Sequence, residues 1–158
     1  MPLVARVSSY LFLLMSLLGC GGKEDEPEPP KAPATNSLTL VTMTPAAGAK
    51  VSKESTIKAT LNYTLADDEA SAFGYRVDLL FKPTVSGVTF TRGQSWVVVP
   101  DKKGTVELTF PLISVWETPA SVPYQLQHPV TCYFYLQRMT APGKSTIIAQ
   151  TPALTFTE

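Results

Sequence analysis

Apolar and polar residues alternate along much of the chain after Asn36, with the period of two that is typical of β-strands with one buried face. The clearest example is segment 57–65, where apolar residues such as Ile57 and Leu61 are separated by lysine, threonine and asparagine. We expect strands over residues 38–43, 57–65, 73–81, 88–90, 96–99, 106–110, 130–139 and 146–157, the last as a strand pair or one broken strand.

Turn residues separate these runs, and no window after Cys20 shows the 3.6-residue period of an amphipathic helix. The segment 141–144, Ala-Pro-Gly-Lys, has the composition of a hairpin turn, and Pro152 fits a strand edge or a bulge. Short strands with turns between them predict an all-β domain over residues 36–158. The expected architecture is an antiparallel β-sandwich of about seven strands.

The start of this domain, Thr-Pro-Ala-Ala-Gly-Ala-Lys-Val over residues 44–51, precedes the strand expected at 57–65. This order resembles the beginning of bacterial immunoglobulin-like and fibronectin-type-III-like domains. The resemblance extends over residues 36–158 as a pattern of strands and turns, and it implies an immunoglobulin-like sandwich that serves as a binding or interaction module. The chain departs from antibody-type domains because the 73–81 strand has no tryptophan and the domain has no cysteine pair.

Residues 1–19 have the layout of a secretory signal peptide, with one charged residue, Arg6, before the apolar run from Tyr10 to Leu18. A transmembrane helix would need about 20 apolar residues, and this run ends too early. The run closes on Leu-Leu-Gly-Cys, which resembles the bacterial lipobox. That resemblance implies acylation of Cys20, which becomes the first residue of the mature protein. The alternative is an ordinary signal peptide with an incidental cysteine.

Residues 20–35 form an acidic, proline-rich tether in this interpretation, without apolar residues large enough to start a core. We expect this tether to be a disordered, semi-rigid spacer between the lipid and the domain. The segment 23–26, Lys-Glu-Asp-Glu, resembles a short signal that directs some lipoproteins to the outer face of the outer membrane. A solvated spacer has the same composition, so the prediction is a lipid-anchored envelope protein of the outer membrane, with surface exposure left open.

The net charge of the chain limits the classes of partner that it can bind. Removal of Arg6 from the 13 basic residues leaves 12 against 13 acidic residues. A chain this close to neutrality has no electrostatic footprint for nucleic acid. Contact with the membrane is therefore assigned to the lipid on Cys20, and the expected partner of the domain is a protein or a glycan.

Catalytic and metal-binding residues are sparse. His128 is the only histidine, and we expect it to lie in a surface loop, away from a nucleophile. With Cys20 acylated, Cys132 is expected to be a small buried residue of a strand. The acidic run 67–69 is interpreted as a solvated loop rather than a calcium site. We therefore expect no enzymatic activity, no metal and no cofactor.

The segment 111–129 is a long proline-rich connection that contains Trp116, Tyr124 and His128. Aromatic side chains on such a loop can stack on sugar rings or anchor a protein partner, or they can close the end of the sandwich. Tyr133 and Tyr135 form a second candidate patch, on the outer face of the sheet if Cys132 faces the core. The leading hypothesis is a non-enzymatic binding module. The alternatives are an accessory glycan-binding lipoprotein of a nutrient-uptake system and a small protease inhibitor.

Overall fold

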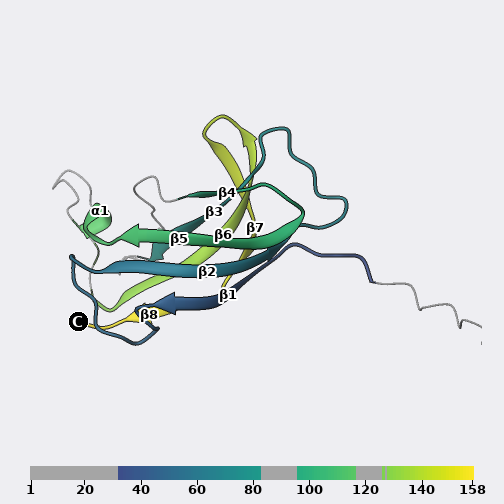
Figure 1. The fold of residues 1–158 in the computed structure, drawn as a ribbon. Helices are drawn as coiled ribbons and strands as arrows, with labels where there is room; N and C mark the ends of the chain where they lie inside the picture. Colours follow the sequence, from purple (N-terminus) through teal and green to yellow (C-terminus); the bar gives the residue numbers. More distant parts are fainter. Residues whose placement is uncertain (1–31, 83–95, 117–125, 127) are drawn as a thin grey trace, which may run out of the picture. The chain divides into compact units, whose positions relative to one another are not determined.

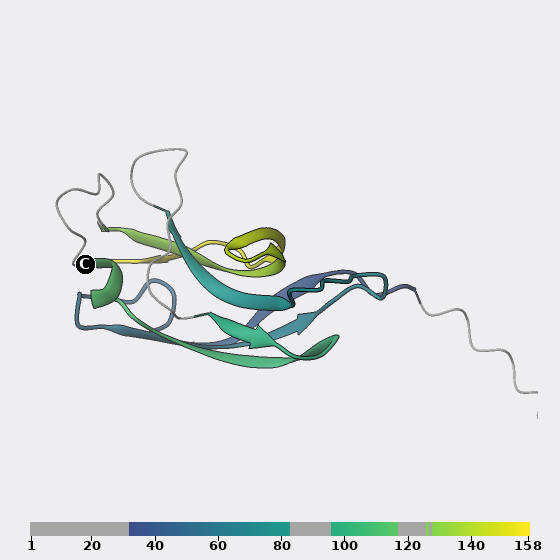
Figure 2. The same cartoon turned by 90° about the horizontal axis from the view of Figure 1, so that it is seen from above.

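Two antiparallel sheets lie face to face in the computed structural model, which describes residues 32–82, 96–116, 126 and 128–158 (Figures 1 and 2). The strands are β1 (Ser37–Thr44), β2 (Thr56–Thr64), β3 (Tyr75–Lys82), β4 (Val97–Val99), β5 (Lys103–Pro111), β6 (Val130–Ala141), β7 (Lys144–Gln150) and β8 (Leu154–Phe156). One sheet has the order β1-β2-β5, and the other has the order β4-β3-β6-β7, with β8 also paired to β6. The predicted all-β sandwich is confirmed.

The three-stranded sheet follows the sequence pattern closely. Burial alternates along the whole of β2: Ile57 and Leu61 are fully buried, and the residues that follow them, Lys58 and Asn62, are exposed. The neighbouring strand β5 alternates in the same way over most of its length and pairs with β2 in continuous register from Thr56 to Thr64. One face of this sheet is therefore core and the other is in contact with solvent.

The core lies between the two sheets. The rings of Phe81 on β3 and Phe110 on β5 are 5.3 Å apart between centroids and tilted by 57°, so they join the two layers directly. Both side chains are fully buried, as are Phe134 and Phe156 from the strands β6 and β8. Burial of a side chain of this size contributes roughly 1.5–3 kcal/mol, so these four rings contribute substantially to the stability of the sandwich.

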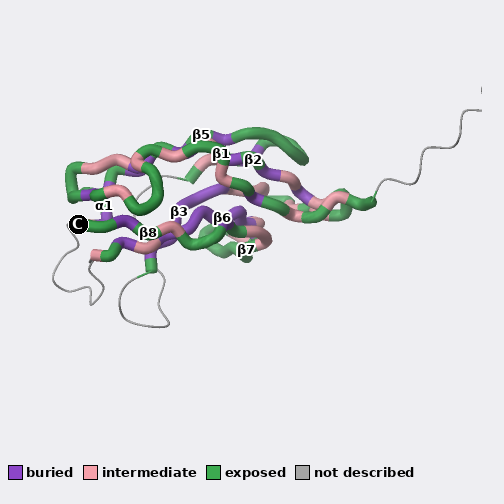
Figure 3. The backbone as a smooth tube through the Cα atoms, turned by 90° about the horizontal axis from the view of Figure 1, so that it is seen from below, coloured by how far each residue is buried: buried purple, intermediate pink, exposed green. Residues whose placement is uncertain are grey.

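The five-stranded sheet differs because its central strands β3 and β6 are buried on both faces (Figure 3). Cys132 points into the main core, as predicted, and burial raises the pKa of its thiol to about 12. The side chains between the core positions, such as Asp78 and Tyr135, are also less than a tenth exposed.

Three local features differ from the expectations or refine them. Phe73 precedes β3 and is 53% exposed, so the third strand begins later than predicted. β5 begins at Lys103, earlier than the strand predicted at 106–110, and includes Gly104, where the ring of Tyr63 packs so close that a Cβ would lie 2.9 Å from its hydroxyl. The last segment is a broken strand, with Pro152 between β7 and β8. The strand expected at 88–90 lies outside the described residues.

The helical content of the described ranges is limited to α1 (Ile113–Trp116). No helix within those ranges has the length and apolar character that crossing a membrane requires.

Candidate functional site

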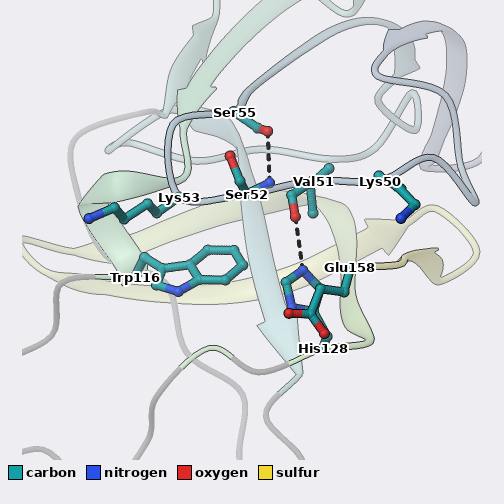
Figure 4. Close-up of a pocket in the computed structure, with 8 residues that line it drawn as sticks. All are labelled: Lys50, Val51, Ser52, Lys53, Ser55, Trp116, His128 and Glu158. Carbon is teal, nitrogen blue, oxygen red and sulfur yellow. Dashed lines mark hydrogen bonds between the residues drawn. The ribbon is translucent and has the colours of Figure 1, made fainter.

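A hollow lies at the end of the sandwich where β2 begins and β5 ends (Figure 4). Its volume of about 510 Å³ is within the range of roughly 300–1,000 Å³ that is typical of small-molecule sites. The lining residues are Lys50, Val51, Ser52, Lys53, Ser55, Trp116, His128 and Glu158. This lining combines aromatic rings, hydroxyl groups and charges of both signs, which suits a polar ligand that also has an apolar face.

Trp116 reaches the hollow because β5 ends at Pro111 and the chain then turns through α1. The Leu112 N–H donates to the Ser55 carbonyl at 2.9 Å, and the Leu112 carbonyl accepts the Trp116 N–H at 3.0 Å. Leu112 and Val115 are fully buried and hold the short helix against the core. The indole of Trp116 is partly buried against the same core and also borders the hollow.

His128 stands beside the indole, with 5.1 Å between ring centroids and a tilt of 56°. Its Nε2 is 2.9 Å from the carbonyl oxygen of Val51. Because a carbonyl oxygen only accepts, Nε2 carries the proton and donates it to Val51. His128 lies in a loop before β6, as expected, but it is not a plain surface residue: the ring is half-buried, held by one hydrogen bond, and packed against Trp116.

The rim above these rings is the segment 50–55. The Ser52 N–H donates to Oγ of Ser55 at 2.9 Å, and the Ser52 hydroxyl donates to the Glu54 carboxylate at 2.7 Å. The Val51 N–H donates to the Thr157 carbonyl at 3.0 Å, which brings Glu158 to the same place. The rim is thus fixed both by its own turn and by the last residues of the chain.

The structure brings together two of the three aromatic residues predicted in the 111–129 loop, Trp116 and His128. Tyr124 lies outside the described residues. The sequence analysis missed Lys50, Lys53 and Glu158. They line the same hollow as the aromatic pair only because distant segments pair there, so no local pattern marked them.

The second predicted patch, Tyr133 and Tyr135, lies on the outward face of β6, as the alternation implied. They do not form an open patch for a ligand, however, because they are only 7% and 5% exposed. The Tyr135 hydroxyl donates to Oδ2 of Asp78 at 3.2 Å, and the backbone N–H of Leu79 donates to Oδ1 at 2.8 Å. These contacts make the tyrosine pair part of a second small core rather than an open surface.

The acidic segment 67–69 is tied into the fold by its own contacts. Arg138 pairs with Glu69 at 3.0 Å, and the Asn36 amide donates to the other carboxylate oxygen at 3.0 Å. The ammonium group of Lys102 donates to three backbone carbonyls of the loop, those of residues 66, 67 and 69. A lysine thus occupies the position where a carbonyl-bound cation would sit. Within the described ranges, no cluster of His, Cys, Asp and Glu is suited to a metal ion.

The chain enters the domain at the end far from the hollow. The Ala34 N–H donates to Asp67 at 3.3 Å, and Ser37 pairs with Thr64 at the last residue of β2. The hollow lies beside Thr56, the first residue of the same strand. Nine residues of a strand span about 30 Å, so the entry point and the hollow lie at opposite ends of the sandwich. Figure 1 shows the start of β1 and helix α1 at these two ends.

No protein-family model matches this sequence, and a search of curated proteins finds no match.

Proposed function

We propose that this chain is a lipid-anchored protein of the bacterial outer membrane whose β-sandwich is a non-enzymatic binding module. The observation that carries the proposal is the position of the aromatic hollow, at the opposite end of the sandwich from the entry of the chain. In this proposal residues 1–19 are removed, Cys20 carries the lipid, and residues 20–35 are the tether. The tether then joins the domain at the end of the sandwich opposite to the Trp116–His128 hollow.

The strand order supports an immunoglobulin-like or fibronectin-type-III-like module. If the strands are lettered along the chain, β1, β2 and β5 correspond to A, B and E, and β3, β6 and β7 correspond to C, F and G. The short strand β4 pairs with β3 instead of joining the A-B-E sheet as a strand D would. The module then belongs to the form in which the fourth strand has moved to the C-F-G sheet.

Glycan binding is the second candidate, and the composition of the hollow favours it. Sugars present polar hydroxyl groups around an apolar ring face, and the hollow offers hydroxyl groups and charges around an indole. The glycan-binding lipoprotein of an uptake system would use the same residues.

The anchoring step is tested by labelling cells with a palmitate analogue while they express the wild type or the Cys20→Ala variant. We expect label on the wild type only, and release of the variant from the membrane fraction. Protease treatment of intact cells then reports the orientation: cleavage of the wild type places the domain on the cell surface, and protection places it in the periplasm. Labelling of the Cys20→Ala variant would contradict the anchor.

The binding step is tested by screening the detergent-solubilised full chain on arrays of glycans and of envelope proteins. A ligand of the hollow must be lost in the Trp116→Ala variant and retained in Trp96→Ala. Trp96 is a matched control, because it lies outside the lining and stacks under Arg76, with 3.9 Å from Cζ to the ring centroid. Binding that is equally strong in both variants would show that the hollow is not the site.

A further inference from the structure

An exposed aromatic residue, Phe73, lies at the end of the sandwich where the chain enters. It is 53% exposed, in the connection between β2 and β3. We propose that Phe73 and the hollow beside it, the Phe73 patch, form a self-association surface on which a second copy of this chain docks about a two-fold axis. The proposed ligand site at Trp116 and His128 is at the opposite end, so this inference goes beyond the binding function and uses only the anchoring step of that proposal.

A short turn holds Phe73 in a fixed position. The Phe73 N–H donates to Oγ of Ser71 at 3.1 Å, and the Ser71 hydroxyl donates to the Met139 carbonyl at 2.6 Å. The Met139 N–H donates to the Gly74 carbonyl at 3.0 Å, and Gly74 has a φ of 78°, which glycine adopts readily. The backbone that presents the ring to solvent is thus tied to β6. Docking on such a backbone has a low entropic cost, because the turn is already ordered.

A hollow of about 300 Å³ lies beside the ring, between this turn and the last residues of β6. Besides Phe73, its lining includes the apolar side chains of Ala70, Ala72 and Met139, and Arg138, whose side chain is 38% exposed. A projecting ring and a partly apolar hollow therefore lie side by side on one surface. A surface with both features can be complementary to a second copy of itself.

A two-fold axis that runs along the hollow satisfies both features at once. It places the turn of one copy opposite the β6 residues of the other, so that each Phe73 ring enters the hollow of the other copy. There the ring meets the thioether of Met139, which favours aromatic contacts. It also meets Arg138, whose planar guanidinium can lie over an aromatic face while it keeps its bond to Glu69.

The charges around the patch are compatible with this docking. On the turn side, the acidic run 67–69 carries three carboxylates; Arg138 pairs with this run and Lys102 donates to backbone carbonyls of the same loop, so one negative charge remains. On the side of β6, Lys144 is exposed in the hairpin that follows. The axis brings the loop of one copy to the hairpin of the other, so unlike charges face each other.

The position of the tether favours a second copy as the occupant. The Asn36 amide donates to Glu69 at 3.0 Å, so the chain enters the domain beside the loop that carries Phe73. Residues 20–31 precede the described domain and would span at most about 40 Å when fully extended. Two anchored copies therefore have their patches within reach of one membrane. Confinement to that membrane raises their effective concentration, which allows a small interface to form pairs.

The experiment measures self-association of the full chain in phosphatidylcholine vesicles. Donor and acceptor dyes are attached to Lys58→Cys, an exposed position on the outward face of the three-stranded sheet. Cys132 is buried in the core, which keeps it from the dyes. We expect energy transfer that rises with the number of copies per vesicle, and an association constant that Phe73→Ala lowers at least tenfold. Val41→Ala is the matched control, because Val41 is 51% exposed on β1, and it should change nothing.

Disulfide trapping tests the two-fold geometry. Copies with Ala72→Cys are mixed with copies with Thr140→Cys, because the axis places the turn of one copy opposite the end of β6 of the other. Oxidation of the two thiols by dissolved oxygen and copper phenanthroline should link unlike copies. The yield should fall at least fivefold when Phe73→Ala is added. Ile113→Cys, 44% exposed in α1 at the other end of the sandwich, should form no link with Ala72→Cys.

The other outcomes can be told apart. Energy transfer that is the same in the wild type and in Phe73→Ala overturns the inference and leaves the patch to solvent or to another protein. Protection of Ala72→Cys from a water-soluble thiol reagent in vesicles with a single copy would place the bilayer on the patch, and it overturns the inference as well.

Failure of the anchor has its own signature, because the chain would then not float with the vesicles. The trapping is in that case carried out in concentrated solution, where links that depend on Phe73 support the patch and their absence overturns it. Ligand binding that depends on Trp116 is measured separately on the arrays, so neither result alters the test of the binding function.

Discussion

The outward faces of the two sheets arise from the same alternation but meet different surroundings. On the three-stranded sheet the outward side chains of β2 and β5 include Lys58, Asn62 and Thr105, all exposed. On the five-stranded sheet the corresponding positions hold Asp78 and Tyr135, which are 4% and 5% exposed. Period-two alternation therefore assigns a side chain to a face of the sheet, but it does not determine whether that face is exposed to solvent.

One pair on each face makes the comparison direct. Thr105 and Asn62 are register partners, and the threonine hydroxyl donates to the amide oxygen at 2.8 Å on the exposed face. Tyr135 and Asp78 are also register partners, and the tyrosine hydroxyl donates to the carboxylate at 3.2 Å on the buried face. Both bonds run from a hydroxyl group to the side-chain oxygen of a register partner. Only the buried bond has no water to replace it, so the two bonds should contribute differently to stability.

The largest difference is expected from removing a whole side chain on each face. Tyr133→Ala deletes a ring that is 7% exposed and packs edge-on against Tyr135 at 6.5 Å, so it should cost about 3–5 kcal/mol of unfolding free energy. Lys58→Ala on the exposed face should change it by no more than about 0.5 kcal/mol. Urea unfolding measures both, and similar values would mean that the two faces are equally solvated in solution.

The second effect comes from removing one hydroxyl on the buried face. Tyr135→Phe keeps the ring but leaves the Asp78 carboxylate with one donor fewer, which should cost about 1–3 kcal/mol. A double-mutant cycle with Asp78→Asn checks the assignment, because residues in contact are not additive. Additive losses would show that the hydroxyl acts independently of Asp78.

The sequence was sufficient for much of the fold. Alternation located β2 and β5 because each strand has one solvent-exposed face, and Pro152 marked the break between β7 and β8. It did not extend β5 back to Gly104, where the ring of Tyr63 on the neighbouring strand leaves no room for a side chain. That contact joins residues far apart in the chain, so no local pattern contains it.

The site was predicted only in part for the same reason. The aromatic residues of the 111–129 loop stood out by composition, and Trp116 and His128 do lie together. The rim lysines, Lys50 and Lys53, lie in the connection between the strands predicted at 38–43 and 57–65. They join the site only because Leu112 bonds to Ser55 and closes the end of the sandwich.

The third prediction concerns pH and the buried carboxyl group. Burial raises the pKa of Asp78, and the hydrogen bonds from Leu79 and Tyr135 offset part of that effect. The folded state therefore holds this proton more tightly than the unfolded state, whose aspartate pKa is about 3.9. The contribution of Asp78 to stability is largest at low pH and declines as the pH rises through the raised value. The stability of the wild type relative to Asp78→Asn should therefore fall as the pH rises from the unfolded-state pKa to the raised pKa of the folded state.

Glu69, at the end of the sandwich, should give stability the opposite dependence on pH. The hydrogen bond from Asn36 and the pairing with Arg138 lower the pKa of Glu69, although burial opposes them. Its contribution is present above the unfolded-state pKa of about 4.3 and is lost as the pH falls through the lowered value. The test is urea unfolding of the wild type, Glu69→Gln and Asp78→Asn from pH 3 to pH 7. The difference in unfolding free energy between the wild type and each variant should rise with pH for Glu69→Gln and fall with pH for Asp78→Asn. Slopes of equal sign would refute this account of Asp78.

The smallest effect is expected from the exposed counterpart of the Tyr135 bond. Thr105→Val replaces the hydroxyl with a methyl group of similar size and leaves a β-branched residue, which suits a strand. Because Thr105 and Asn62 are exposed, water can take over the hydrogen bond, and the free energy of unfolding should change by no more than about 0.5 kcal/mol. A loss as large as that of Tyr135→Phe would mean that the hydrogen bond itself, and not the burial of Asp78, sets the energetic weight of the pair.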